Sequence, residues 1–190
     1  MNPRTPNRLV AKQFWLFVIS LFWVVLVVSP GLAQQKPDQL LVYGDNFMFS
    51  VKEPPGWHGD TINAEKVQSN AVLHESGQPT DSTFGLIRIS VNDKVDKNTL
   101  ADLQADMRAY KAQYPTVQFK AIVAKNPNYS CLARVFYVPG KFHEYVAYVN
   151  PGPQKPMLFS VSMNTGKSEA TTKELEAFRL AIQSLTLLKP

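Results

Sequence analysis

The sequence predicts an α+β domain, an αβα sandwich in which an antiparallel β-sheet of about six or seven strands is flanked by two main helices, preceded by a signal peptide. Three observations lead to this prediction. Two distant segments each carry a single apolar stripe at helical spacing. Short alternating runs bounded by turn residues fill most of the remaining chain. The N-terminus is a basic stretch followed by a long apolar run.

The first 33 residues have the composition of a secretory signal. Basic residues without any acid precede an unbroken apolar run, residues 14–28. Pro30 and Gly31 then interrupt the run, and small residues lead to an expected cleavage after Ala33. An uncleaved anchor is the alternative, because the run is only a little shorter than the about 20 apolar residues that a transmembrane helix needs.

The remaining chain divides into a tether and one domain. Residues 34–39 are polar and contain Pro37, so they are expected to be flexible. Residues 40–190 are long enough for one sizeable core and are assigned to a single α+β domain. Cys131 is the only cysteine of the chain, so no internal disulfide supports this domain, and its apolar flanks indicate a small buried residue.

Most of the net positive charge lies in the signal segment. The whole chain has 20 Lys and Arg against 15 Asp and Glu, and residues 1–33 hold three of the basic residues and no acidic one. The mature chain therefore keeps 17 basic and 15 acidic residues, a net charge of +2. We expect no nucleic-acid partner, because such binding needs many clustered Lys and Arg contacts to phosphate.

Two helices are expected from apolar spacing of i, i+3, i+7 and i+10. The first begins at Asn98 or Thr99, which can cap it, and ends before Pro115. The second follows a capping box between Thr171 and Glu174. Their apolar stripes are Leu100, Leu103, Met107 and Tyr110, and Leu175, Phe178, Ile182 and Leu185.

Strands are expected on both sides of the first helix. The early part of the domain alternates or is apolar in short runs, and the later part does so between turns that contain Pro, Gly and Asn. Connections this short favour antiparallel neighbours, so the last three strands should form a meander. The expected strands are 40–43, 47–51, 71–74, 84–91, 117–124, 132–138, 142–149 and 157–163.

At this level the chain resembles the PsbP-like αβα sandwich family, whose fold is shared with the Ran-binding protein Mog and related bacterial domains. The resemblance lies in residues 49–57, a strand followed by Pro54-Pro55-Gly56 and Trp57, in the strand 144–149, and in residues 178–187 as the final helix. It implies an assembly or binding module without catalysis. No residue matches a photosystem-binding or Ran-binding position, so no such role is carried over.

No catalytic, cofactor or metal site is predicted. His58, His74 and His143 do not occur at ligand spacing from one another or from the cysteine, whereas structural zinc normally takes four such ligands. No Gly-x-Ser-x-Gly motif or glycine-rich phosphate loop occurs. Asp102 and Asp106 lie four residues apart on the first helix, which is more typical of a solvated face than of a general acid and base.

Four aromatic residues are the candidate interaction surface. Trp57 follows a rigid proline corner, and Tyr129, Tyr145 and Tyr148 could join it in an exposed patch of the kind favoured at binding hot spots. The alternative is that these side chains fill the core. The alternating pattern of the strands favours the filled core, because half of the residues of each strand face inward.

These observations together predict an exported, non-enzymatic domain, periplasmic or secreted, that binds a protein partner or helps to assemble a complex at the cell envelope. Contact with a membrane is expected only through an uncleaved signal segment. The alternative function is a small-molecule or metal-binding protein, or a hydrolase without a recognised motif, with a cleft between sheet and helix. A polar pocket around His74 or His143 would favour that alternative.

Overall fold

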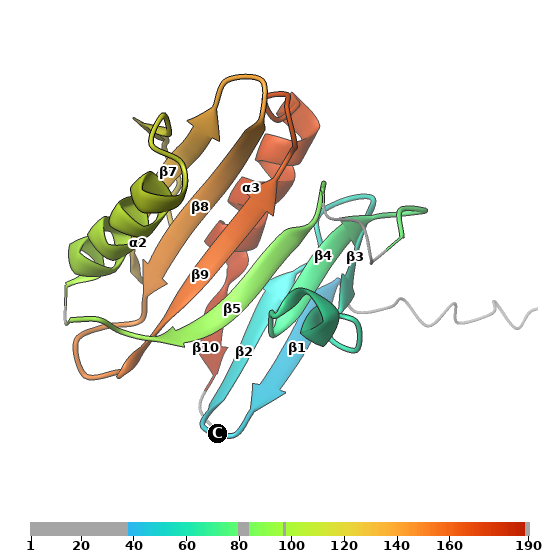
Figure 1. Cartoon of the computed structure of the whole chain (residues 1–190). Helices are drawn as coiled ribbons and strands as arrows, with labels where there is room; N and C mark the ends of the chain where they lie inside the picture. Colours follow the sequence, from blue (N-terminus) through green and yellow to red (C-terminus); the bar gives the residue numbers. More distant parts are fainter. Residues whose placement is uncertain (1–37, 80–83, 97, 189–190) are drawn as a thin grey trace, which may run out of the picture. The chain divides into compact units, whose positions relative to one another are not determined.

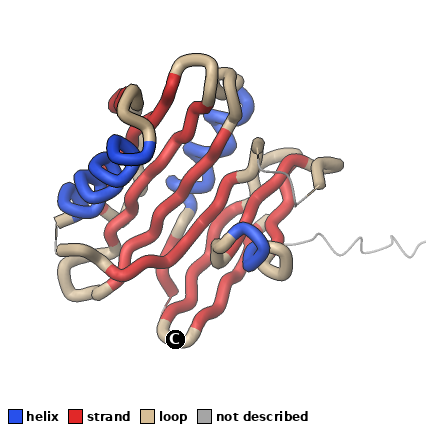
Figure 2. The backbone as a smooth tube through the Cα atoms, viewed as in Figure 1, coloured by secondary structure: helices blue, strands red, loops and turns tan. Residues whose placement is uncertain are grey.

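The computed structural model describes residues 38–79, 84–96 and 98–188 of the chain. The expected signal peptide, its cleavage site after Ala33 and most of the tether lie outside these residues. The described residues belong to a compact unit that begins at Asp38. In chain order they form β1 (Gln39–Gly44), β2 (Phe47–Lys52), β3 (Trp57–Asp60), η1 (Ala64–Val67), β4 (Ala71–Glu75), β5 (Ile87–Asp93), α2 (Thr99–Gln113), β6 (Gln118–Ala121), β7 (Ser130–Val138), β8 (Phe142–Asn150), β9 (Met157–Asn164), α3 (Thr172–Ser184) and β10 (Thr186–Leu188), as Figures 1 and 2 show.

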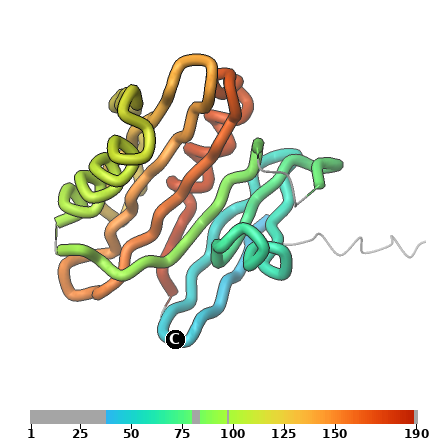
Figure 3. Tube along the Cα trace, viewed as in Figure 1, coloured from blue at the N-terminus to red at the C-terminus, as the bar shows by residue number. Residues whose placement is uncertain are grey.

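Seven strands form one antiparallel sheet in the spatial order β3-β4-β5-β9-β8-β7-β6. The predicted meander of β7, β8 and β9 is confirmed by their antiparallel registers. Strand β5 comes from the first half of the chain but pairs with β9, so the early strands extend the same sheet (Figure 3). The α+β class with an antiparallel sheet and two main helices is therefore confirmed.

A second, three-stranded antiparallel sheet has the order β1-β2-β10. Strands β1 and β2, expected at residues 40–43 and 47–51, form an antiparallel hairpin, but they do not join the large sheet. The sequence pattern extended the final helix to Leu187, whereas α3 ends at Ser184 and β10 pairs with β2. The inner row of this small sheet includes Val42 and Phe49, which are buried in the same core cluster as α3.

The large sheet is buried on both faces at β8. Along β8, Ala147 belongs to the core cluster that contains Phe178 of α3. Its neighbour Val146 belongs to the cluster that contains Leu103 of α2. Successive side chains of a strand point to opposite faces, so the two helices cover opposite sides of the sheet, as Figure 1 also shows. Helix α2 lies over β7 and β8, while α3 contacts β9 and also β2 of the small sheet.

The face that α2 turns to the sheet differs from the predicted stripe. Leu103 is buried as expected, but Leu100 is 42% exposed. Asp102, expected on a solvated face, is 6% exposed, and its Oδ1 accepts a hydrogen bond from the Val95 backbone N–H at 2.7 Å. The spacing of apolar residues cannot show that a carboxylate is buried as the acceptor for a loop N–H group. The prediction for Asp102 is therefore wrong. Asp106 remains exposed and accepts a hydrogen bond from the Tyr148 hydroxyl.

Both helices begin with the caps that the sequence indicated. The Asn98 side chain accepts a hydrogen bond from the Leu100 N–H at the start of α2. Thr171 and Glu174 form a reciprocal capping box at the start of α3. Such caps satisfy backbone N–H groups that have no partner inside the helix, so they fix where each helix begins.

The end of α3 is held by one buried amide. Asn126 Nδ2 donates to the carbonyl oxygens of Ile182 and Leu185, at 2.7 and 2.8 Å. Its Oδ1 accepts from the backbone N–H groups of Asn128 and Tyr129, at 2.9 and 3.1 Å. The side chain thereby ties the loop before β7 to the helix end, where β10 begins.

Replacement of this amide tests that tie. Asn126→Ala is expected to lower the free energy of unfolding by about 2–4 kcal/mol, because buried backbone groups lose their partners. Asn128→Ala is the matched control on the same loop, with an exposed side chain, and should change stability by less than about 0.5 kcal/mol. Urea unfolding of both variants measures the difference. Equal, small effects would contradict the role given to Asn126.

Candidate functional site

The candidate aromatic surface is largely core. Trp57, Tyr145 and Tyr148 are 3%, 5% and 3% exposed, and Tyr129 is half-buried. The first three residues therefore do not form the candidate exposed patch, and the filled core, which strand alternation favours, describes them. They lie at inward positions of their strands, where large side chains exclude water.

The tyrosine hydroxyls have partners inside the fold, which removes the cost of burying them. The Tyr145 hydroxyl accepts a hydrogen bond from the Ala170 N–H at 3.0 Å, and the Tyr129 hydroxyl accepts one from the Leu187 N–H at 3.0 Å. Burial also raises the pKa of Tyr145. The indole Nε1 of Trp57 is buried without a hydrogen-bond partner.

His58 and His74 lie side by side although 16 residues separate them in the chain. They are cross-strand partners on β3 and β4, with ring centroids 6.2 Å apart, and His58 Nδ1 is 3.8 Å from Glu53 Oε2. The sequence missed this pair because the register of two strands, not their spacing, creates it. Among the described residues no group of three or more His, Cys, Asp or Glu side chains could hold a metal ion.

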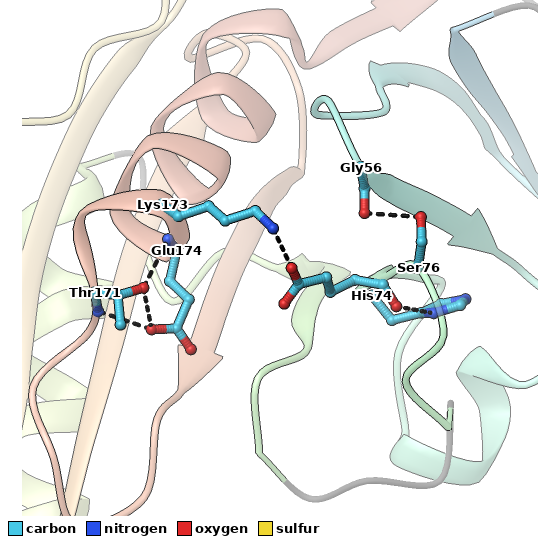
Figure 4. A network of polar contacts seen from close by, with 7 residues as sticks. Gly56, His74, Ser76, Thr171, Lys173 and Glu174 are labelled. Carbon is cyan, nitrogen blue, oxygen red and sulfur yellow. Dashed lines mark hydrogen bonds and ion pairs between the residues drawn. The ribbon is translucent and has the colours of Figure 1, made fainter.

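This strand end is tied to α3 by polar contacts. Lys173 of α3 pairs with Glu75, the neighbour of His74 (Figure 4). His74 Nδ1 lies 3.2 Å from the backbone oxygen of Glu75, and the Ser76 hydroxyl donates to the Gly56 carbonyl at 2.9 Å. These contacts join the strand end to the helix, and His74 does not line the cavity beside His143 or the pockets bordered by Arg179 and Arg88.

A cavity of about 190 Å³ lies between the large sheet and α3, and His143 is in its wall. Strands β6, β7 and β8 supply one side, because residues two apart on each strand face α3 together. Helix α3 and the segment before it supply the other side. The lining side chains are Lys120, Ile122, Val135, Tyr137, His143, Tyr145, Glu169, Leu175, Phe178 and Arg179.

His143 is the polar group that this cavity leaves unsatisfied. Its ring stacks on Tyr137 across the strands, with centroids 5.5 Å apart and an interplanar angle of 3°. The backbone N–H of His143 donates to the Gly166 carbonyl at 2.7 Å, and this hydrogen bond holds the first residues of β8 in place. The Nδ1 atom is buried and has no hydrogen-bond partner. A buried ring nitrogen without a partner is costly, so a group that bonds to it would gain free energy.

The charged lining residues stand at the mouth of the cavity and the apolar ones below. Lys120, Glu169 and Arg179 are exposed, whereas Val135 and Phe178 are buried. Among the described residues that line the cavity, none is a Ser, Thr or Cys, the side chains that most often act as nucleophiles. The arrangement can therefore hold a compact molecule with one hydrogen-bonding group and an apolar body.

Sequence reasoning named His143 but none of these charged residues. They come from β6, from the segment before α3 and from α3 itself, which meet only in the fold. Cys131 lies on β7, on the same face of the sheet, and outside the cavity lining. Burial raises the pKa of its thiol to about 11, so the thiol stays protonated near neutral pH and is a poor nucleophile.

Comparison with known proteins finds similar chains among the solved structures. No family model matches the sequence, and none of the curated protein sequences matches it. The solution structure of cyanobacterial PsbP (CyanoP) from Synechocystis sp. PCC 6803 is similar over 84% of this chain and 96% of that chain, with 16% sequence identity and a TM-score of 0.45.

No helix in the described part of the chain is long and apolar enough to cross a membrane.

Proposed function

We propose that this chain is an exported binding domain that acts without catalysis, and that the cavity between the large sheet and α3 takes a small molecule. The observation that carries the proposal is the cavity itself, whose wall joins apolar side chains to the half-buried ring of His143, a residue whose Nδ1 has no hydrogen-bond partner. The basic and apolar segment at residues 1–33 supports export.

The size and lining of the cavity indicate the kind of ligand. An apolar cavity of about 150 Å³ in another protein binds benzene, so about 190 Å³ accommodates a ring with one substituent. The apolar floor would contact the ring, and a hydroxyl on the ring would bond to His143 Nδ1. Phenol has this shape, and toluene matches it without the hydroxyl, so the two form a matched pair of probes.

Binding of these probes tests the cavity. Wild-type protein is expected to bind phenol roughly 3- to 10-fold more tightly than toluene, the difference that one net hydrogen bond makes. His143→Phe keeps a ring to stack on Tyr137 but removes the nitrogen, so the preference should disappear. Ligand-observed NMR and titration of amide chemical shifts measure both affinities.

His74→Phe is the control, because His74 is a half-buried histidine of the same sheet outside the cavity. It should keep the preference of the wild-type protein. Binding of neither probe up to their solubility, or an equal preference in the wild-type protein and His143→Phe, would contradict the assignment.

A protein partner at the cell envelope is the second candidate function, and the outer face of the small sheet favours it. Tyr43, Met48 and Leu188 are aligned across β1, β2 and β10 in one row. Tyr43 is 69% exposed and Leu41, on the same face of β1, is 46% exposed. Exposed aromatic and aliphatic side chains on adjacent strands are typical of interaction surfaces.

A site-specific crosslink tests this surface. A photoreactive phenylalanine at Tyr43 is expected to join the exported chain to one specific envelope protein in the native host. The same group at Lys111, an exposed position of α2, is the control and should not form that product. Leu41→Ser should reduce the yield at Tyr43 several-fold. Identical products from both positions would show that the face is not selective.

A further inference from the structure

A polar strip runs along the face of the large sheet that α2 covers only in part. Strands β5 and β9 place Arg88 beside Ser162 and Ser90 beside Ser160 on this face. No helix crosses the middle of these two strands between α2 and η1 in Figure 1. The strip differs from the neighbouring strands β7 and β8, whose side chains on the same face pack under α2.

Arg88 is the charged residue in the middle of the sheet on this strip. Its strand neighbours in register are Val72 of β4, which is fully buried, and Ser162 of β9. The guanidinium Nε is buried and has no hydrogen-bond partner. The ion pairs of the described residues join His58 to Glu53 and Lys173 to Glu75, so they do not include Arg88. A guanidinium has five N–H donors, and those of Arg88 other than the buried Nε belong to its two Nη groups.

Arg88 borders a pocket of about 350 Å³. Lys66 and Gln68, at the end of η1, line one side, and Asn164, at the end of β9, lines another. Phe84 and Leu86, which precede β5, add apolar surface. Lys66 Nζ donates to Asn63 Oδ1, a neutral amide oxygen, at 2.7 Å.

The electrostatics of this pocket favour one class of ligand. The described residues of its lining include the two cationic side chains of Lys66 and Arg88 and the two amides of Gln68 and Asn164. A guanidinium offers parallel N–H groups that match the two oxygens of a carboxylate or phosphate, and an ammonium adds a point charge. An apolar wall beside the cations suits a ligand whose anionic group is attached to an aromatic or aliphatic body.

We infer that the pocket between η1, β5 and the end of β9 binds an organic oxyanion, with Arg88 and Lys66 as the residues that hold its charged oxygens. The site lies on the opposite face of the sheet from the His143 cavity, since Arg88 is in register with the residues that face α2. It is therefore independent of the function proposed above.

The test is an amide chemical-shift titration of the folded protein at low ionic strength, where screening is weak. The probes are phenyl phosphate, inorganic phosphate and benzoate. Phenyl phosphate should bind most tightly, because it supplies both an oxyanion and a ring for the apolar wall. Comparison with benzoate separates phosphate recognition from carboxylate recognition, and either result is consistent with an oxyanion site.

Variants assign the binding to the pocket. Arg88→Gln should weaken phenyl phosphate at least tenfold, and Lys66→Gln should weaken it several-fold. Arg134→Gln is the matched control. Arg134 is a half-buried arginine of β7 on the same face of the large sheet as Arg88, and it lies outside the pocket. Its Nη1 donates to the Ala133 carbonyl at 2.9 Å. It removes the same charge and should leave the affinity unchanged.

The result is decisive in either direction. Loss of affinity in Arg88→Gln and Lys66→Gln, with Arg134→Gln unaffected, supports the site. The inference is overturned if no probe binds below about 10 mM, which corresponds to less than about 3 kcal/mol of binding free energy, or if a folded Arg88→Gln binds as the wild-type protein does. Should Arg88→Gln fail to fold, Lys66→Gln on the exposed η1 decides, and unchanged affinity in that variant contradicts the proposal.

Discussion

The constraint on which this structure depends is that the central strands of one antiparallel sheet are buried on both faces. Strand β8 shows it most clearly, because Ala147 packs on the α3 side and Val146 on the α2 side. A shift of one residue in register would exchange the two faces and expose both sets of apolar side chains. The chain has one cysteine, so this double burial carries the stability that disulfides give to many exported domains.

The two candidate ligand sites lie where this coverage ends. On the α3 side the helix passes over the end of β8 and leaves the His143 cavity. On the α2 side the helix covers β7 and β8 but not β5, so Arg88 stays beside the pocket at η1. Polar groups in these two places lack the partners that the packed regions provide, and unsatisfied buried groups are where a ligand gains most.

The sequence could predict elements whose determinants are local. The Thr171 and Glu174 capping box, the stripe of α3 and the turns of the meander are all visible within short windows. Three features depended on distant segments and could not be predicted: the pairing of β5 with β9, the strand β10, and the meeting of His58 with His74. The two candidate ligand sites also depend on distant segments. The sequence shows that Arg88 is a polar residue in an alternating strand, but it does not show which side chains of other strands lie beside it.

Native-state hydrogen exchange of the backbone amides tests the doubly buried sheet most directly. If β8 is covered from both sides, its amides exchange only through global unfolding and are the slowest in the domain, while those of the edge strand β1 exchange through local opening and are faster. Exchange of the β8 amides at the rate of β1 would contradict the account.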